Sequence, residues 1–352
     1  MPRVWKWICA ILFAAVAVGC IGGVAKKSAS SASLVSLRGL TMGSHWSVKY
    51  VASSGAPDRL VVQRAMQTHL DRLESQMSTW RADSELSRFN HSQNTNWFAV
   101  SGETARVTAE AQRISKLTEG AFDVTVLPFL KLWGFGARAK PRRVPATAEI
   151  AAVRASVGWE KLEVRLNPPA LRKSVGELQV DLSGIAPGFA ADELGDWLEK
   201  HGVTNYLADV GGELRAHGID PRGDGWRVGI ERPENQARRV DVVVTLGNGS
   251  LATSGDYRNF FEQGGKRYGH ILNPRTGSPS ESAVASVSVT HESAMTADAL
   301  ATALMVLGVE RGMEFSRREG LAVRFVERKN GKLVESMSPS FRLMLNPGRV
   351  PR

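Results

Sequence analysis

Two polar side chains stand out in the otherwise apolar stretch Ser293–Gly308. Asp298 and Thr302 are four residues apart, so on a helix they share one face, about one turn apart. Because an apolar helix is usually buried, its carboxylate must be paired, hydrogen-bonded or bound to a metal. A carboxylate and a hydroxyl are hard oxygen ligands of the kind that Mg²⁺ prefers. The pair therefore indicates a candidate metal site on a buried helix.

The same pair has a plainer interpretation. An Asp near a helix start is favoured by the helix dipole, and a Thr can bond a backbone carbonyl one turn back. Thr296 is a plausible N-cap and Gly308 a C-terminal stop for this helix. Taken alone, the stretch is described more simply as a capped core helix, and the metal site stays an alternative.

A second group of polar residues lies earlier in the chain, in Thr253–Arg258 (TSGDYR) and His270–Gly277 (HILNPRTG). His270 lies in a predicted strand beside a turn, where a histidine is either structural or a general base. Arg275 could clamp a phosphate or brace the turn. The sequence contains no nucleophile elbow, Walker loop or paired-His metal motif.

A glycine-containing turn joins a predicted short strand, Val180–Leu182, to a predicted helix, Phe189–His201. A strand, turn and helix in this order can cradle a phosphate on backbone N–H groups, although a two-glycine turn is a weak signal. Pro187 suits the first helical position, where no N–H is required. Between the predicted elements, Met77–Asn90 is polar and turn-prone, typical of a surface loop or of a surface that binds through hydroxyls.

The elements that must position these residues indicate an α+β fold. Apolar periodicity predicts helices over Asp58–Met77 and Glu103–Thr118, and the dipeptides Asn248-Gly249 and Asn330-Gly331 predict hairpins. Strands and helices do not alternate regularly, which argues against a doubly wound sheet. The predicted strands are Tyr206–Val210, Trp226–Ile230, Val240–Leu246, Ser250–Thr253, Tyr268–Leu272, Ala283–Thr290, Ala322–Arg328 and Lys332–Glu335.

Composition narrows the class of protein. The chain has 352 residues, is 43% hydrophobic and 23% charged, and carries a formal charge of +10. These values are typical of a globular protein with one large domain or two ordinary ones. The positive charge suits an anionic ligand such as a nucleotide, or an anionic membrane surface. Because the Lys and Arg residues are scattered, without interleaved aromatic residues, we expect no nucleic-acid partner.

The first twenty residues predict a targeting segment. Arg3 and Lys6 precede an apolar run, Ile8–Val18, that is too short to cross a bilayer comfortably. The small residues before Cys20 resemble a bacterial lipobox, which predicts a signal peptide over 1–20 and lipidation of Cys20. An uncleaved signal anchor is the alternative. We therefore expect a protein of the bacterial cell envelope, facing the periplasm and lipid-anchored to the inner or outer membrane.

Both cysteines of the chain, Cys9 and Cys20, lie in this segment, so a disulfide or cysteine metal site in the folded part is excluded. Residues 21–36 include a small, Ser-rich stretch and predict a flexible tether. We expect residues 37–350 to form a single large domain.

In chain order, these motifs resemble the ApbE family of FAD:protein FMN transferases, often periplasmic lipoproteins. The resemblance covers most of the chain after the tether. Its pieces are Thr41–Gly43, Met77–Trp80, Ser87–Asn90, Gly120–Asp123, Pro128, Trp133–Gly136, Val180–Ala186, Val210–Gly212, Ala252–Arg258, His270–Gly277, Ala297–Ala299 and Thr302.

The resemblance implies a T-fold-like domain and a reaction. FAD would be cleaved at its pyrophosphate, the FMN half would pass to a Thr or Ser hydroxyl of a target protein, and AMP would leave. Mg²⁺ is expected because phosphoryl transfer rests on positioning and charge neutralisation. The target would be a flavoprotein of a membrane redox complex.

The resemblance also assigns roles to residues. Asp298 and Thr302 would hold the metal, with backbone carbonyls near Gly184 and Ala301, and His270 would be the general base. Trp80 replaces a more common Tyr, and either ring can stack on a flavin or adenine face. The positions that would bind FAD are Met42, Trp80, Ala121, Phe122, Asp123, Asp181, Pro187 and Leu272.

Two positions depart from the family's pattern. Pro187 stands where the family usually has Lys, which removes a positive charge from the phosphate-binding turn. Asn273 stands where the family usually has Asp, which removes a negative charge beside the predicted base. Two other functions stay open: an FAD pyrophosphatase that gives FMN and AMP, and a lipoprotein that only binds flavin. The helix offers only two ligands, so we expect weak Mg²⁺ binding until FAD adds phosphate oxygens.

Overall fold

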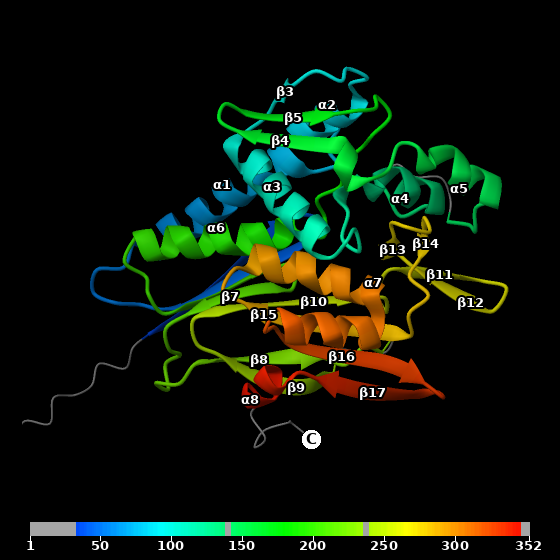
Figure 1. The fold of residues 1–352 in the computed structure, drawn as a ribbon. Helices are drawn as coiled ribbons and strands as arrows, with labels where there is room; N and C mark the ends of the chain where they lie inside the picture. Colours follow the sequence, from blue (N-terminus) through cyan, green and yellow to red (C-terminus); the bar gives the residue numbers. More distant parts are fainter. Residues whose placement is uncertain (1–32, 138–141, 235–238, 346–352) are drawn as a thin grey trace, which may run out of the picture. The chain divides into compact units, whose positions relative to one another are not determined.

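The computed structural model describes residues 33–137, 142–234 and 239–345 (Figure 1). The predicted signal peptide with Cys20, most of the tether and the end of the predicted domain lie outside the described residues. Within the described ranges, no helix has both the length and the apolar character needed to cross a bilayer.

The centre of the fold is an eight-stranded sheet whose neighbouring strands all run antiparallel. Its first strand begins at Leu34, so the last three residues of the predicted tether are part of the sheet instead. In spatial order the strands are β1 (Leu34–Thr41), β2 (Ser44–Val51), β6 (Tyr206–Val210), β7 (Glu213–His217), β10 (Gly249–Gly255), β15 (Val284–His291), β16 (Ala322–Lys329) and β17 (Lys332–Met337).

Helices α6 and α7 lie directly on one face of this sheet, whereas α8 lies on the opposite face, where its Phe341 is buried (Figure 1). The two faces are distinguished by alternation along each strand: on β10, Ala252 joins the core under the helices while Leu251 joins a second core on the opposite face. The helices are α1 (Arg59–Met77), α2 (Glu85–His91), α3 (Gly102–Leu117), α4 (Leu127–Trp133), α5 (Thr147–Arg154), α6 (Ala186–Lys200), α7 (Ala294–Arg318) and α8 (Pro339–Leu343), with short 3₁₀ turns at Val124–Val126 and Trp159–Lys161.

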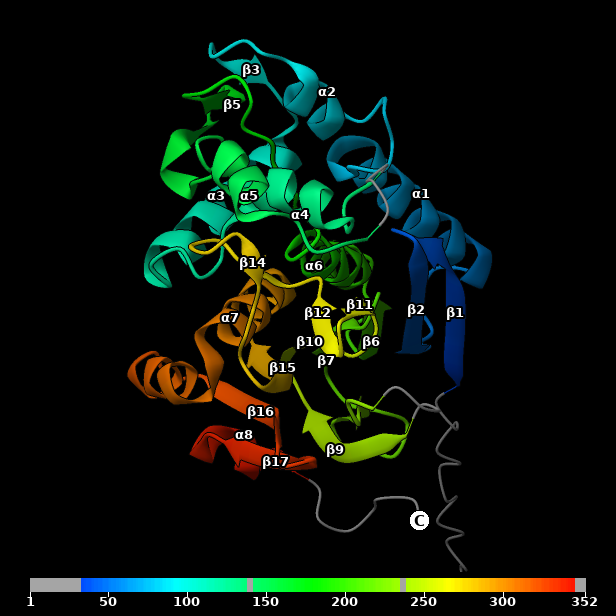
Figure 2. The ribbon, with the colours of Figure 1, turned by 90° about the vertical axis from the view of Figure 1, so that its right-hand side faces the viewer.

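Smaller sheets of two or three strands surround the main sheet (Figure 2). One packs beside α3, one covers the second core, and two short hairpins follow β10. Their strands are β3 (Phe98–Ala99), β4 (Leu162–Leu166), β5 (Pro169–Lys173), β8 (Trp226–Glu231), β9 (Val240–Leu246), β11 (Phe260–Gln263), β12 (Lys266–Gly269), β13 (Leu272–Asn273) and β14 (Ser278–Pro279).

Where local pattern dictates the element, prediction and structure agree. Asp58 caps α1 through Leu60 N, and the predicted apolar stripe of α1 is buried. Asn330 and Gly331 both have positive φ (53° and 72°), as a tight type I′ hairpin between β16 and β17 requires. The mixed helix and antiparallel architecture confirms the predicted α+β class.

The hairpin predicted at Asn248-Gly249 is wrong. Strand β9 pairs with β8 in the small sheet, whereas β10 pairs with β7 and β15 in the main one. The Asn248 side chain instead accepts a hydrogen bond from Gly218 N of a neighbouring turn. The chain therefore passes from one layer to another at this dipeptide, because β9 buries its apolar residues in the second core.

The predicted strand Val180–Leu182 is also wrong, since the segment is irregular. The Asn90 side chain takes the place of a strand partner: it donates to Val180 O (2.8 Å) and accepts from Val180 N (2.7 Å). Asn90 belongs to α2, so part of the predicted surface loop Met77–Asn90 is a helix. The predicted strand Tyr268–Leu272 is divided into β12 and β13 on either side of His270.

Helix α7 differs from its prediction at both ends. Its N-cap is Ser293, whose hydroxyl accepts from Thr296 N, rather than Thr296. Gly308 interrupts the helix with φ 77° and ψ 176°, but helix resumes and continues to Arg318. The predicted stop is therefore a kink. Helix α6 begins at Ala186 rather than Phe189, which makes Pro187 its second residue.

Candidate active site

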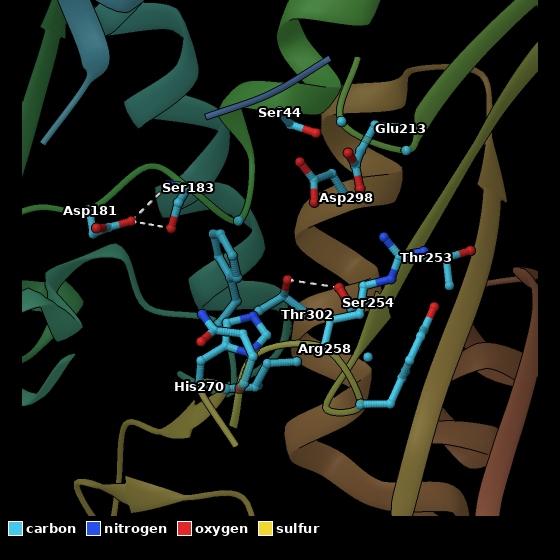
Figure 3. Close-up of a pocket in the computed structure, with 18 of the residues that line it drawn as sticks. Ser44, Asp181, Ser183, Glu213, Thr253, Ser254, Arg258, His270, Asp298 and Thr302 are labelled. Atoms are coloured by element: carbon cyan, nitrogen blue, oxygen red, sulfur yellow. Dashed lines mark hydrogen bonds between the residues drawn. The ribbon is translucent and has the colours of Figure 1, made fainter. Parts of the chain in front are cut away.

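Residues from several separate segments line one cavity of about 490 Å³ (Figure 3). Its walls come from the first half of α7, the turn before α6, the β6–β7 turn, the end of β10 and the loop that carries His270. A cavity of this size, with a few polar groups converging on it, can hold a small-molecule substrate.

Asp298 and Thr302 both face this cavity from α7. Asp298 is only 5% exposed, and its Oδ2 accepts from Gly188 N (3.1 Å) at the start of α6. The positive end of the α6 dipole therefore lies at this carboxylate. Thr302 Oγ1 lies 3.1 Å from Ser254 Oγ of β10, within hydrogen-bond distance. The prediction that this helix presents an acid and a hydroxyl on one face is confirmed.

Two glycines, Gly184 in the turn before α6 and Gly188 in the first turn of α6, let this segment approach α7 closely. A Cβ on Gly184 would lie 3.3 Å from Thr302 Oγ1, and a Cβ on Gly188 would lie 2.3 Å from the Ala294 carbonyl oxygen. The second contact is impossible for any other residue without a backbone shift. The small residues of the predicted turn thus bring the backbone at Gly184 next to the Asp298–Thr302 face.

A second carboxylate, Glu213, faces Asp298 (Figure 3). Burial raises the pKa of Asp298 to about 7. Burial, together with the negative charges of Asp298 and Asp209, raises the pKa of Glu213 well above its usual range. The site therefore disfavours two anionic carboxylates unless a positive charge accompanies them. Glu213 was missed by sequence reasoning, although an acid directly after Gly211-Gly212 is a signal that could have identified it.

These residues fit Mg²⁺. The donors are hard oxygens, and a divalent cation beside Asp298 and Glu213 would offset the repulsion between the two buried carboxylates. Across the described ranges, no group of three or more His, Cys, Asp or Glu side chains could hold a metal ion. A cation here would therefore also need the Thr302 hydroxyl, the backbone near Gly184 and oxygens of a bound ligand.

His270 lies on the cavity wall away from Asp298, in the connection between β12 and β13 (Figure 3). Its Nδ1 lies 3.2 Å from the Asn259 carbonyl oxygen, which can only accept, so Nδ1 carries the proton and Nε2 is the basic nitrogen. Burial lowers the pKa of His270. A neutral imidazole with an available Nε2 can act as a general base.

Asp181 and Asp123 line a third wall beside the aromatic ring of Phe122. Asp181 accepts hydrogen bonds from Ser183 N (2.8 Å) and from Thr79 Oγ1 (3.4 Å). Burial raises the pKa of Asp123 to about 6, although hydrogen bonds from the backbone and hydroxyl of Thr125 and from Trp159 N oppose this rise. These groups give this wall both an apolar ring and polar acceptors.

The cavity brings together most of the predicted site, but four predicted residues do not line it. Trp80 is 70% exposed, and Ala301 is fully buried inside α7. Met42 lies in the β1–β2 turn with φ 51°, where its N–H bonds the Glu74 carboxylate. Their assigned roles, and that of Pro187, stay predictions. The predicted residues that do line the cavity are Ala121, Phe122, Asp123, Asp181, Gly184, His270, Leu272, Asp298 and Thr302.

The structure gives different surroundings to the two departures from the family's pattern. Pro187 is the second residue of α6, and its Cβ would lie 4.0 Å from a Cβ placed on Gly211. The Asn273 side chain accepts a hydrogen bond from Arg275 N (2.9 Å), and the backbone carbonyl oxygen of Asn273 accepts one from Gly277 N (2.8 Å). Asn273 thus organises the turn after His270, an arrangement that an Asp side chain would also allow.

Comparison with known proteins identifies the fold and the family. A model described as the ApbE family matches residues 42–325. The chain is 42% identical to the FAD:protein FMN transferase of Vibrio cholerae over 97% of its own length and 99% of the relative's, and 39% identical to that of Salmonella typhimurium over 93% and 94%. The solved structure of flavin transferase ApbE from Vibrio cholerae superposes with a TM-score of 0.83 at 43% identity and covers 89% of this chain and 99% of that one. The apo form of Pseudomonas stutzeri flavinyl transferase ApbE does so with 0.81 at 38% identity, over 89% and 96%. The chain belongs to the ApbE family.

Proposed function

We propose that this protein is an FAD:protein FMN transferase that uses Mg²⁺ and releases AMP. Its full-length similarity to transferases of that name supports the flavin chemistry. The single observation that carries the proposal is one cavity that holds both the Asp298–Thr302 face and a basic His270 nitrogen. Phosphoryl transfer to a hydroxyl requires one group to neutralise phosphate charge and another to accept a proton.

The reaction balances with these groups. The oxygen of a Ser or Thr hydroxyl of the target protein attacks the phosphorus of the FMN half, and the bond from that phosphorus to the AMP oxygen breaks. His270 Nε2 accepts the hydroxyl proton. A bound Mg²⁺ would neutralise the pyrophosphate charge. Asp298, Thr302 and the backbone near Gly184 would hold the metal, and Ser254 would orient the Thr302 hydroxyl through their 3.1 Å contact.

FAD would lie across the other walls of the cavity. Phe122 offers a ring for stacking, while Asp181 and Asp123 offer acceptors for hydroxyl or ring N–H groups. Trp80, exposed in the segment whose Thr79 bonds Asp181, could cover a bound ring system from outside. Because the chain supplies few metal ligands, FAD phosphate oxygens would complete the site, and Mg²⁺ would bind weakly before FAD. Calorimetry that found tight Mg²⁺ binding to flavin-free protein would contradict this order.

The protein would work at the periplasmic face of the bacterial envelope, lipid-anchored through Cys20 beside a membrane redox complex whose flavoprotein it modifies. The lipobox-like sequence before Cys20 supports this location. Cys20→Ala should release the protein from the membrane fraction into the periplasm. Retention of the variant in the membrane would favour the signal-anchor alternative.

The direct test incubates the protein with FAD, Mg²⁺ and candidate envelope flavoproteins, followed by mass spectrometry of the candidates. A transferase leaves an FMN-sized adduct on a Ser or Thr and releases AMP in equal amount. FMN and AMP both free in solution, without an adduct on any candidate, would favour the pyrophosphatase. FAD bound but uncleaved would favour a flavin-binding lipoprotein.

A further inference from the structure

Two donors of His270 converge on one acceptor. The backbone N–H of His270 donates to the Asn259 carbonyl oxygen at 3.1 Å, and the ring Nδ1 donates to the same oxygen at 3.2 Å. A carbonyl oxygen has two lone pairs, so His270 occupies both. The orientation and tautomer of the imidazole therefore depend on where this carbonyl is held.

Arg142 holds the segment that carries this carbonyl. Its Nη2 donates to Asn259 Oδ1 (2.6 Å) and its Nη1 donates to the Phe260 carbonyl (2.9 Å). The planar guanidinium thus grips two successive residues in a fixed fork. The two contacts span 117 and 118 positions of the chain, so they tie the segment before α5 to the loop that positions His270.

One aromatic ring packs against both partners. The Arg142 guanidinium lies 5.1 Å from the centre of the Phe135 ring, and the His270 ring meets Phe135 edge-on at 6.4 Å between centres. Phe135 also packs against Phe261 of β11. Arg142 is therefore located by a ring contact as well as by its hydrogen bonds.

The charges facing His270 come from separate segments. Burial is the main cause of its lowered pKa, and the positive charge of Arg142 acts in the same direction. The hydrogen bond to Asn259 and the negative charges of Asp256 and Asp181 oppose this lowering. Loss of Arg142 would therefore raise the pKa of His270 and would also loosen the Asn259 carbonyl to which the His270 ring is bonded.

We infer that Arg142 and Asn259 are positioning residues for His270, which hold its imidazole as the Nδ1–H tautomer and leave Nε2 to accept the proton of the acceptor hydroxyl. The catalytic consequence rests on the proposed role of His270 as general base. The tautomer itself does not, so it can be measured independently.

The experiment compares Arg142→Ala, Arg142→Lys and Asn259→Ala in the full chain. The matched control is Arg143→Ala, because Arg143 is a neighbouring arginine that pairs with Glu149 instead. Nitrogen-15 NMR of histidine-labelled protein reports the His270 tautomer, with its signals assigned by their loss in His270→Ala. Steady-state FMN transfer gives kcat, KM for FAD and their pH dependence.

Arg142→Ala should lower kcat roughly tenfold to a hundredfold, while KM for FAD stays within about twofold. It should also populate the second tautomer and move the acidic limb of the kcat profile to higher pH. In Arg142→Lys the acidic limb should return close to its normal pH, whereas kcat should recover only in part. Lysine keeps the positive charge but cannot make both hydrogen bonds of the guanidinium. Asn259→Ala keeps the carbonyl and should have a smaller effect than Arg142→Ala. Arg143→Ala should leave all readouts unchanged.

An unchanged Nδ1–H tautomer together with an unchanged kcat in Arg142→Ala would overturn the inference. If His270→Ala transferred FMN at the normal rate, the proposed base would be wrong. A tautomer shift in Arg142→Ala would nevertheless still support the positioning role. The two failures are thus distinguishable.

Discussion

Two walls of the cavity carry the groups proposed to take part in the reaction, and the structure holds these two walls in place by different means. On one, Asp298 and Thr302 project from a helix packed on the main sheet, and glycines allow backbone to approach them within van der Waals contact. On the other, His270 lies between two short hairpins, held by a carbonyl that Arg142 secures. One wall is positioned by close packing and the other by hydrogen bonds between loops.

This difference teaches where each wall is sensitive. The packed wall buries two acids side by side, so its energetics are dominated by charge and desolvation. The loop wall carries a neutral base, so its function depends on orientation and tautomer. Substitutions on the packed wall should change charge neutralisation, and substitutions on the loop wall should change proton transfer.

The largest effect is expected on the packed wall. Asp298→Ala should reduce both FMN transfer and FAD cleavage by about a hundredfold to a thousandfold, because the carboxylate that would hold the metal is lost. Asp298→Asn should be equally inactive but still folded, since it can accept the Gly188 bond without a buried charge. Glu310→Ala, an exposed acid on the same helix, is the control. Normal transfer by Asp298→Ala in Mg²⁺ would refute the metal assignment.

The loop wall should fail differently. His270→Ala should slow FMN transfer by roughly a hundredfold to ten-thousandfold, the usual contribution of a general base. FAD should still bind, as measured by quenching of flavin fluorescence, because the packed wall and the Phe122 side are untouched. If the transfer rate is unaffected, His270 is not the base, and the contrast between the walls loses its functional meaning.

A smaller effect is expected from the hydroxyl that supports Thr302. Ser254→Ala removes one neutral hydrogen bond, worth about 1 kcal/mol, so the Mg²⁺ concentration that gives half-maximal transfer should rise tenfold or less. Ser288 does not line the cavity, and Ser288→Ala removes a similar bond, to Thr253 (2.9 Å), while leaving the contact between Ser254 and Thr302 in place, so the Mg²⁺ dependence should stay unchanged. Equal Mg²⁺ dependence in the two variants would show that Ser254 does not orient Thr302.

The smallest effect concerns stability and pH. Folding raises the pKa of Asp123 from 3.8, the ordinary value of an aspartate, to about 6. Between these two pH values the folded state therefore binds more protons than the unfolded state. The free energy of unfolding should therefore fall as pH rises from about 4 to about 6, by no more than about 3 kcal/mol from this group. Asp123→Asn should remove that slope in denaturant unfolding series. An identical slope in both proteins would mean that Asp123 titrates normally.

Much of the packed wall was predictable because its signals are local. The four-residue spacing of Asp298 and Thr302 determines a shared helical face wherever the helix lies. The stripe of α1 and the hairpin at Asn330-Gly331 follow equally from periodicity and from turn residues that tolerate positive φ. The hairpin signal at Asn248-Gly249 had the same form, but burial of β9 in another layer overrode it.

The sequence by itself determined the family's motifs, the α+β class and the residue types that the chemistry needs. The tertiary structure decided that Glu213 faces Asp298 and that Asn90, 90 residues away, takes the place of a strand partner for Val180. It also decided that Arg142 holds the carbonyl beside His270. The physical reason is distance along the chain. Periodicity and turn chemistry act over a few residues, whereas these contacts exist only after layers of helix and sheet bring remote segments together.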